Sequence, residues 1–152
     1  MTISNLNSDI AITLSKNKFT NDFALVKDAN SIRQSIINII LTIPGEKPFN
    51  QNFGTSINDY LFETYHPITS AVLATEIKNT VQLYETRALI NEVLINDSPI
   101  VENTGYIKKL TSNPSDLIDA GILYIYISYS VNHISSTTPM KDAISLGLIK
   151  VR

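Results

Sequence analysis

Residues 122–131 carry the strictest hydrophobic alternation in the chain, and this segment constrains the fold more than any other. Apolar side chains alternate with aromatic or polar ones in the order Leu123, Tyr124, Ile125, Tyr126, Ile127, Ser128, Tyr129, Ser130 and Val131. Successive side chains of a strand point to opposite faces of a sheet. The pattern therefore predicts a long strand with its odd-numbered residues in a core and its even-numbered residues on an amphipathic surface. A chain with such a strand must build a sheet and cover one face of it.

Further strands are predicted on both sides of this segment. Residues 142–151 carry Ile144, Leu146 and Leu148 on one parity, which predicts a partner strand antiparallel to the first across a turn at residues 135–139. Residues 9–14 and 23–26 show shorter alternations, and residues 89–95 predict a mostly buried strand. The sheet is therefore expected to be mainly antiparallel, with long C-terminal strands.

Two segments have the periodicity of amphipathic helices. Residues 31–42 follow Asp28 and Asn30, both candidate N-caps, and are stopped by Pro44-Gly45. Residues 67–84 begin with a proline, which suits the first turn of a helix. Apolar residues recur three or four positions apart in both segments, at Ile32, Ile36, Ile39, Ile40 and Ile43, and at Leu73, Ile77, Val81 and Tyr84. The sequence therefore predicts two main helices that pack on the sheet.

The connection between these helices is expected to be ordered. Residues 45–54 combine turn residues with Phe49 and Phe53, which we expect to pin the loop to the core. Ser56 and Asp59 form a capping-box pattern at the start of a short helix. Its buried residues are predicted to be Ile57, Tyr60 and Leu61.

The predicted class is α+β, in one small domain. A length of 152 residues suits a single core without disulfides or metal. Residues 1–8 are polar and predict a flexible N-terminal arm, so the folded domain is expected to span residues 9–152. Residues 96–115 are polar and turn-rich, which is consistent with a loop or a loose hairpin.

Composition argues against several classes of ligand and location. Twelve basic and fourteen acidic residues leave a formal charge of -2, so no strong positive field draws the protein to nucleic acid or anionic lipid. There are no cysteines, which excludes disulfides and thiolate metal sites. The longest apolar stretch, residues 120–131, is shorter than the roughly 20 residues of a membrane helix, and residues 1–10 lack a signal-peptide pattern. We expect a protein that binds neither nucleic acid nor membranes.

The sequence offers no clear catalytic or metal centre. His66 and His133 are the only histidines and lie far apart, without an HExxH arrangement. Serine-nucleophile and phosphate-loop motifs are also absent. The acidic residues could supply a carboxylate pair for a glycoside hydrolase, with Glu63, Glu76 and Glu85 as the first candidates. Solvated helix positions and caps explain them better, so we expect no catalytic residues, cofactor or metal.

Glu85-Thr86-Arg87 is the most unusual local feature. In an extended chain both charged side chains would point the same way, and Arg87 could bind a carboxylate of a partner in a bidentate manner. The simpler interpretation, favoured by spacing, is an intramolecular salt bridge worth about 0 to 1 kcal/mol. Replacement of Arg87 by alanine would then leave the fold intact.

Several separated motifs, taken in their order, resemble one known family. The chain carries Ile32-Arg33-Gln34, Leu41-Thr42-Ile43-Pro44-Gly45-Glu46, Phe49, Asn52-Phe53-Gly54, Tyr60-Leu61-Phe62-Glu63 and Tyr84-Glu85-Thr86-Arg87. This order resembles the baseplate wedge and sheath-initiator family of contractile tails, some members of which are called lysozyme-like. The resemblance covers residues 9–95. Thr86 stands where the family has a proline between Glu and Arg, and Gln51 replaces another family proline, so the local backbone is less rigidly restricted here.

The resemblance implies a structural role rather than an enzymatic one. It implies a wedge subunit near the tail tube that docks on the wedge core bundle through Glu85, Thr86 and Arg87. It also implies that the C-terminal strands template the first sheath ring, through Tyr124, Tyr126, Ser128, Ser130, Ile144, Leu146 and Leu148. An exposed strand edge suits this because it offers backbone hydrogen bonds to another chain.

The partners implied by the family are the tail sheath protein, the wedge core-bundle proteins and the tail tube or hub proteins. Family analogy suggests six copies per baseplate, in a virion assembled in the host cytoplasm. Two alternatives stay open: a tail-associated peptidoglycan hydrolase, and the same sheath-seeding role in a phage-derived bacteriocin or injection machine.

Overall fold

The computed structural model describes residues 8–62, 66–97, 100–103, 106–109, 122–131 and 140–149. In chain order these residues form β1 (Ser8–Ile10), β2 (Leu25–Lys27), α1 (Ala29–Leu41), α2 (Ile57–Tyr60), α3 (Pro67–Tyr84), β3 (Ala88–Asn96), β4 (Ile100–Asn103), β5 (Tyr106–Lys109), β6 (Ile122–Val131) and β7 (Met140–Ile149). The fold is α+β, as the periodicities predict. The two main helices and the two long C-terminal strands lie close to their predicted bounds.

The central sheet has the strand order β3-β6-β7, and both pairings are antiparallel. β6 and β7 pair over ten residues without a bulge, from Ile122 opposite Ile149 to Val131 opposite Met140. β3 pairs with the other edge of β6, with a register shift between Ile90 and Glu92. The antiparallel pairing predicted for the C-terminal strands is therefore confirmed, and β6 is the middle strand.

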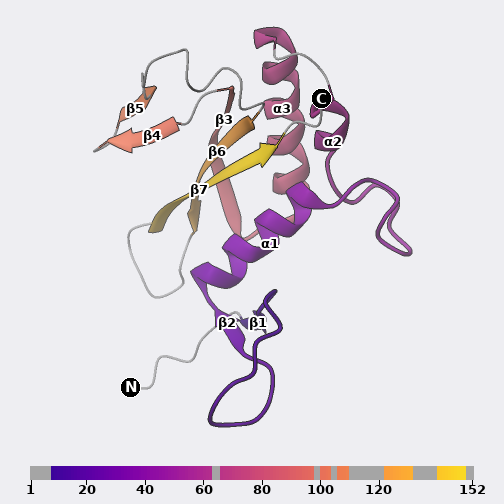
Figure 1. Cartoon of the computed structure of the whole chain (residues 1–152), viewed down its shortest axis with the longest axis vertical. Helices are drawn as coiled ribbons and strands as arrows, with labels where there is room; N and C mark the ends of the chain where they lie inside the picture. The colour runs from indigo at the N-terminus through magenta and orange to yellow at the C-terminus, as the bar shows by residue number, and fades with distance from the viewer. Residues whose placement is uncertain are drawn as a thin grey trace.

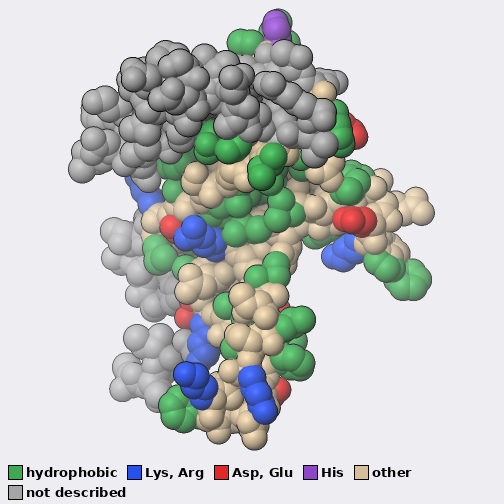
Figure 2. Space-filling model, in the orientation of Figure 1, with side chains coloured by type: hydrophobic (Ala, Val, Ile, Leu, Met, Phe, Trp, Pro, Cys, Tyr) green, Lys and Arg blue, Asp and Glu red, His purple; other side chains and the backbone are tan. Residues whose placement is uncertain are grey.

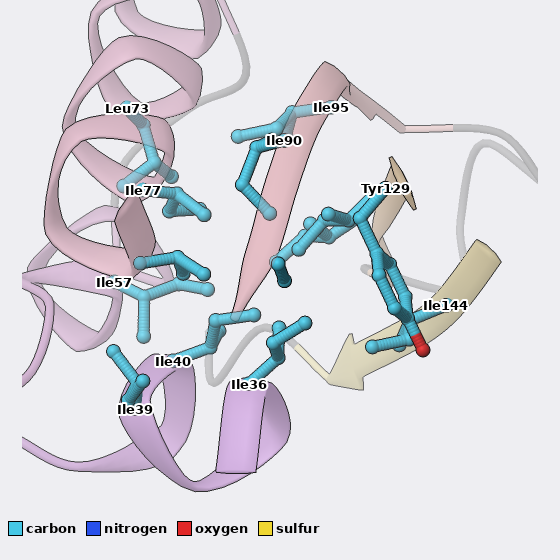
Figure 3. Packing of buried hydrophobic residues seen from close by; sticks show 14 of the residues in the cluster. Ile36, Ile39, Ile40, Ile57, Leu73, Ile77, Ile90, Ile95, Tyr129 and Ile144 are labelled. Atoms are coloured by element: carbon cyan, nitrogen blue, oxygen red, sulfur yellow. The ribbon is translucent and has the colours of Figure 1, made fainter. Parts of the chain in front are cut away.

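The core lies between one face of this sheet and helices α1 and α3. Figure 1 shows α3 alongside the sheet and α1 across one end of it. The predicted core residues of both helices are buried except Ile43, which is exposed beyond the end of α1, and Tyr84, which is half-buried. Figure 3 shows Ile36, Ile40, Leu73 and Ile77 pointing toward the strands. Full burial of one such side chain contributes about 1.5–3 kcal/mol. Helix periodicity thus correctly identified the residues that hold the two layers together.

The connection between α1 and α3 is ordered, but the prediction that Phe49 pins it to the core is wrong. Phe49 has a relative exposure of 107%, with φ at 65°, so it points away from the core. Phe53 does contact the body: its ring centroid lies 4.9 Å from that of Tyr84, and Lys47 Nζ lies 3.8 Å from its ring centroid. Phe53 is therefore the apolar anchor of the loop, and the ring of Phe49, at a residue with a positive φ, faces solvent.

A close approach of two backbone segments explains why Gly54 stands at the end of this loop. A Cβ at that position would lie 2.1 Å from the carbonyl oxygen of Thr42, and the φ of Gly54 is +115°. The next residue, Thr55, donates from its backbone N–H to Thr42 O at 3.0 Å and from Oγ1 to Ile40 O at 2.7 Å. The loop is therefore joined to the end of α1 by backbone contact.

The capping-box prediction for α2 is also wrong in detail. Ser56 is the N-cap of α2, but its side chain makes no capping hydrogen bond. Its Oγ donates to the carboxylate of Glu76 on α3 at 2.7 Å, and its backbone N–H donates to Glu76 Oε1 at 2.8 Å. Asp28, a candidate cap of α1, likewise makes no side-chain capping bond. Of the predicted core residues of α2, Ile57 is fully buried, whereas Tyr60 and Leu61 are half-buried.

The N-terminal segment departs most from its predicted form. The strand expected over residues 9–14 ends at Ile10, because Leu14 has a φ of 47° in a turn. Among the strands that the structure describes, β1 pairs with β2, and this small hairpin projects beyond α1 (Figure 1). Ser8, expected in a flexible arm, opens β1. Residues 1–7 lie outside the described residues.

Two further predictions concern β3 and the polar segment after it. β3 alternates between buried and exposed positions, with Leu89 half exposed, so the expectation of a mostly buried strand is wrong. Within the polar segment, β4 and β5 pair as an antiparallel hairpin, which agrees with the hairpin alternative. Residues 110–115, the predicted turn at residues 135–139 and residues 150–151 lie outside the described residues.

Candidate assembly surfaces

The junction between α3 and β3 brings Glu85 and Arg87 together. Arg87 Nε donates to Glu85 Oε1 and Nη2 donates to Oε2, each at 2.6 Å. The backbone is not extended as expected: Ala88 N–H donates to Glu85 O at 3.3 Å, which closes a turn over Thr86. The intramolecular salt bridge favoured by spacing is therefore present, in a turn that lets the two side chains meet each other.

This pair is more buried than a surface salt bridge. The side chain of Glu85 is only 3% exposed, whereas that of Arg87 is 40% exposed. Burial by itself would raise the pKa of Glu85, but hydrogen bonds from Arg87 and Ser35, with the charge of Arg87, outweigh it and lower the pKa below 4.5. The hydrogen bonds to Glu85 in turn raise the pKa of Arg87. Glu85 is thus an ionised carboxylate held inside the junction, so the expected surface position of this residue is wrong.

Arg87 keeps part of its hydrogen-bonding capacity outside the pair. The two bonds to Glu85 use Nε and Nη2, and a guanidinium group has five N–H donors. Thr86, at the corner of the turn, is exposed. We call Glu85, Thr86 and Arg87 the α3–β3 corner. Its geometry allows Arg87 to bind an acceptor on another molecule while Glu85 fixes its orientation.

The second predicted surface, along β6 and β7, is divided differently from expectation. β6 pairs on both of its edges, so its backbone cannot accept a further strand. Tyr126 and Ser130, expected at the surface, are 5% and 8% exposed, and Tyr124 and Ser128 are half-buried. The expectation that the even-numbered side chains of β6 form an open surface is therefore wrong for Tyr126 and Ser130.

β7 is one of the two edge strands of the described sheet; the other is β3. β7 is ten residues long, pairs with β6 on one side, and pairs on the other side with no strand that the structure describes. Ile144 is fully buried, and Leu146 and Leu148 pack half-buried against the core. These three side chains anchor β7 to the body. A partner could contact the backbone edge of β7 together with its exposed side chains, such as Ser145 and Ile149.

Tyr129 and Asp142 form a polar contact within the sheet that the sequence analysis missed. They face each other across β6 and β7, and Tyr129 Oη donates to Asp142 Oδ2 at 2.7 Å. Tyr129 is fully buried, and burial, followed by this hydrogen bond and the charge of Asp142, raises its pKa well above 10.0. A tyrosine at a core-facing, odd-numbered position of the strand could have indicated this contact, because a buried phenol hydroxyl needs a hydrogen-bond partner.

Glu76 and Glu85, the two carboxylates considered for hydrolysis that the structure describes, do not form a pair. Glu76 accepts hydrogen bonds from Ser56, Glu85 is ionised beside Arg87, and Glu63 lies outside the described residues. Glu76 and Glu85 are nine residues apart on α3 and its C-cap, which separates their Cα atoms by roughly 13 Å along the axis. The two carboxylates of a glycoside hydrolase lie about 5–9.5 Å apart, and one has a raised pKa. The separation of Glu76 and Glu85 along the helix and the lowered pKa of Glu85 do not fit such a pair.

The described residues also bear on metal and membrane binding. Within them, no group of three His, Cys, Asp or Glu side chains is placed to hold a metal ion. Among the same residues, no helix has the length and apolar character needed to cross a membrane. His66 is an exposed N-cap of α3 and accepts from the backbone N–H of Ile68 at 3.3 Å. His133 lies outside the described residues.

Comparison with known proteins identifies one family. The family model described as baseplate wedge protein gp25 matches residues 26–134. The baseplate wedge protein gp25 of Enterobacteria phage T4 is 30% identical over 119 residues, which covers 76% of this chain and 88% of that protein.

Two solved structures have a similar fold. The crystal structure of a proposed tail lysozyme from Geobacter sulfurreducens has a TM-score of 0.60 at 21% identity, and the match covers 85% of this chain and 98% of that chain. A chain in the cryo-EM structure of the anti-feeding prophage baseplate, solved with 6-fold symmetry, has a TM-score of 0.54 at 22% identity, covering 67% and 79%.

Proposed function

The chain belongs to the gp25 family of baseplate wedge proteins, and from this membership we propose that it docks on the wedge core bundle through the α3–β3 corner and templates the first sheath ring through β7. The protein is a structural component of the tail baseplate. The docking partner and the sheath contact are the new elements of the proposal. In this proposal the wedge proteins and the sheath protein bind different faces of the protein.

The free edge of β7 is the observation that carries the sheath contact. A strand edge presents unpaired N–H and C=O groups at regular spacing, and another chain can add to it without a pocket. β7 offers ten residues, is held in place by its pairing with β6, and is anchored by Ile144 in the core. The edge is therefore rigid before a partner arrives, which lowers the ordering cost of adding a strand.

The α3–β3 corner supports the wedge contact by its preorganisation. Glu85 holds the guanidinium group of Arg87 through two short hydrogen bonds, and Ser35 of α1 binds the same carboxylate. A partner that accepts a hydrogen bond from Arg87 therefore does not have to order a free arginine side chain. Thr86 stands where the family has a proline. Here the ion pair between Glu85 and Arg87 restricts the corner in place of that proline.

The remaining partners follow the same reasoning. A wedge subunit that carries the first sheath ring lies near the tail tube or hub proteins, and six copies agree with the 6-fold symmetry of the similar anti-feeding prophage baseplate. We propose no enzymatic activity. The hydrolase alternative draws on a fold likeness to one proposed tail lysozyme, and the positions of Glu76 and Glu85 give it no support.

Hydrogen exchange tests the β7 contact directly. In an edge strand, alternate amides point away from the sheet and exchange quickly. Addition of the purified sheath protein should protect these alternate amides of Met140–Ile149 and leave the exposed face of α3 unchanged. Sheath binding that leaves β7 exchange unaltered would refute the template role.

A matched variant separates the two surfaces. Arg87→Ala should weaken binding to the wedge core-bundle proteins and leave sheath-dependent protection of β7 unchanged, because the corner does not include β7. The measurement is made well below the melting temperature of the variant, with circular dichroism to check the fold. Loss of both contacts in a folded variant would mean that the surfaces are not independent.

A further inference from the structure

The N-terminal hairpin, residues 8–27, exposes an unusual amount of apolar surface. Phe19, at its tip, is 97% exposed. Five more large apolar side chains of the hairpin are about half exposed or more, namely Ile10, Ile12, Leu14, Phe23 and Leu25. A two-stranded hairpin is marginally stable by itself, and concentrated apolar surface of this kind marks an interaction site.

The hairpin is nevertheless held in a defined position. Gln34 of α1 donates from Nε2 to Ile10 O at 2.8 Å and accepts from Ile12 N–H at 2.9 Å, as a neighbouring strand would. At the tip, Phe19 N–H donates to Asn17 Oδ1 at 2.9 Å. The exposed apolar side chains are thus displayed on an ordered scaffold that is joined to the body through α1.

Consecutive residues of α1 connect the hairpin to the α3–β3 corner. Gln34 binds the hairpin backbone, and the next residue, Ser35, binds the carboxylate of Glu85. Asp9 of β1 is close enough for its charge to act on Arg87. The hairpin and the corner therefore lie next to each other beside the middle of α1, and a partner bound to Arg87 would lie next to the hairpin.

The family match begins at residue 26, so most of the hairpin lies outside it. We propose that the N-terminal hairpin extends the wedge-docking surface and binds an apolar patch bordered by carboxylates on the wedge core-bundle protein that contacts Arg87. This inference rests on the docking role proposed for the α3–β3 corner.

Charge identifies the kind of partner. Lys16 and Lys18 flank the exposed apolar residues near the hairpin tip, and Figure 2 shows Lys and Arg side chains gathered over this end of the molecule. Carboxylates around an apolar centre on the partner would complement them.

A double variant of the full-length protein tests this surface. Leu14→Ser with Phe19→Ser removes two exposed side chains without touching the core, so the melting temperature should stay unchanged. Binding to the purified wedge core-bundle proteins should weaken by about tenfold to a hundredfold, measured by isothermal titration calorimetry. The matched control is Phe49→Ser, which removes an equally exposed aromatic ring from another loop and should bind as the unaltered protein does.

Each other outcome has a definite meaning. If the double variant binds normally while Arg87→Ala binds weakly, the inference about the hairpin is wrong and the docking role of the corner stands. If the unaltered protein does not bind the wedge proteins, the proposed function fails, and this inference fails with it. Equal weakening by Phe49→Ser would show nonspecific apolar binding, and sedimentation of a dimer that the double variant dissociates would identify a second copy as the partner; either result overturns the proposal.

Discussion

Replacement of Arg87 by alanine tests whether the ion pair with Glu85 stabilises the junction between α3 and β3. The substitution removes both short hydrogen bonds to the carboxylate, whose side chain is 3% exposed. The bonds from Ser35 and from the backbone N–H of residue 87 remain. Glu85 would then be a buried anion with only part of its hydrogen bonding satisfied, which is the costly arrangement in a protein interior.

The structure sets the size of the effect. Breaking a fully buried pair costs about 3–5 kcal/mol, whereas exposed pairs contribute about 0–1 kcal/mol. Arg87 is 40% exposed, so water can reach the space it leaves and reduce the cost. We expect the free energy of unfolding to fall by about 2 kcal/mol, or the melting temperature by about 4–8 °C for a domain of this size. This loss of stability exceeds the value of about 0–1 kcal/mol that the sequence alone suggested for the salt bridge.

The loss should depend on pH in a predictable direction. In the unaltered protein the pKa of Glu85 is lowered, so its contribution to stability is present above pH 4.5 and is lost as the pH falls through the lower folded-state value. Without Arg87, burial dominates and the pKa of Glu85 rises above 4.5. The variant then loses stability as the pH rises through this raised value. The difference between the two proteins should therefore shrink in acid.

Urea denaturation of both proteins across this pH range measures the effect. Thr86→Ala is the control, because Thr86 is exposed in the same turn and should change stability by less than about 0.5 kcal/mol. The double variant Glu85→Gln with Arg87→Ala should be more stable at neutral pH than Arg87→Ala alone, since it buries no charge. An Arg87→Ala protein as stable as the unaltered one at every pH would refute the reasoning.

Three further predictions concern the rest of the molecule. Gly54→Ala should destabilise by more than about 2 kcal/mol in urea denaturation, because the added Cβ meets the Thr42 carbonyl oxygen, whereas Gly45→Ala adds only the cost of a positive φ, about 1 kcal/mol; equal losses would contradict this. Tyr129, whose pKa is raised, should stay protonated above pH 10.0 until the protein unfolds, and its share of the stability is lost as the pH rises beyond that value. Ultraviolet absorbance titration of Tyr129→Phe should therefore match the unaltered native protein, and loss of one titrating group in the variant would refute the prediction. Gln34→Ala should speed hydrogen exchange in residues 8–27 without lowering the melting temperature, and unchanged exchange would mean that Gln34 does not hold the hairpin.

Local patterns predicted much of the fold. The spacing of Ile32, Ile36 and Ile40 and of Leu73 and Ile77 identified the buried faces of both main helices, because helix geometry maps sequence distance directly onto one face. Strand alternation identified β6, β7 and their core-facing side chains for the same reason. The order of separated motifs between Ile32 and Arg87 was sufficient to suggest the family, and the family match confirms it.

The candidate surfaces were predicted only in part. Sequence placed Glu85 and Arg87 near each other, but the burial of Glu85 depends on α1, which is distant in the chain. Alternation placed Tyr126 on the outer face of β6, yet it could not show that this face is covered. Phe49 and Phe53 have similar sequence surroundings, and only packing against Tyr84 distinguishes the anchor from the exposed ring.

The sequence by itself determined which residues of each helix and strand face inward, because these periodicities arise from the geometry of single elements. Only the tertiary structure decided that β3 and β7 are the edge strands of the described sheet, since the position of β6 between them depends on pairings between distant segments. The same holds for the N-terminal hairpin: Ile12 and Leu14 alternate like core residues, yet they face solvent. Hydrophobic alternation indicates which side chains favour apolar surroundings. Only the fold decides whether the same chain or a partner provides those surroundings.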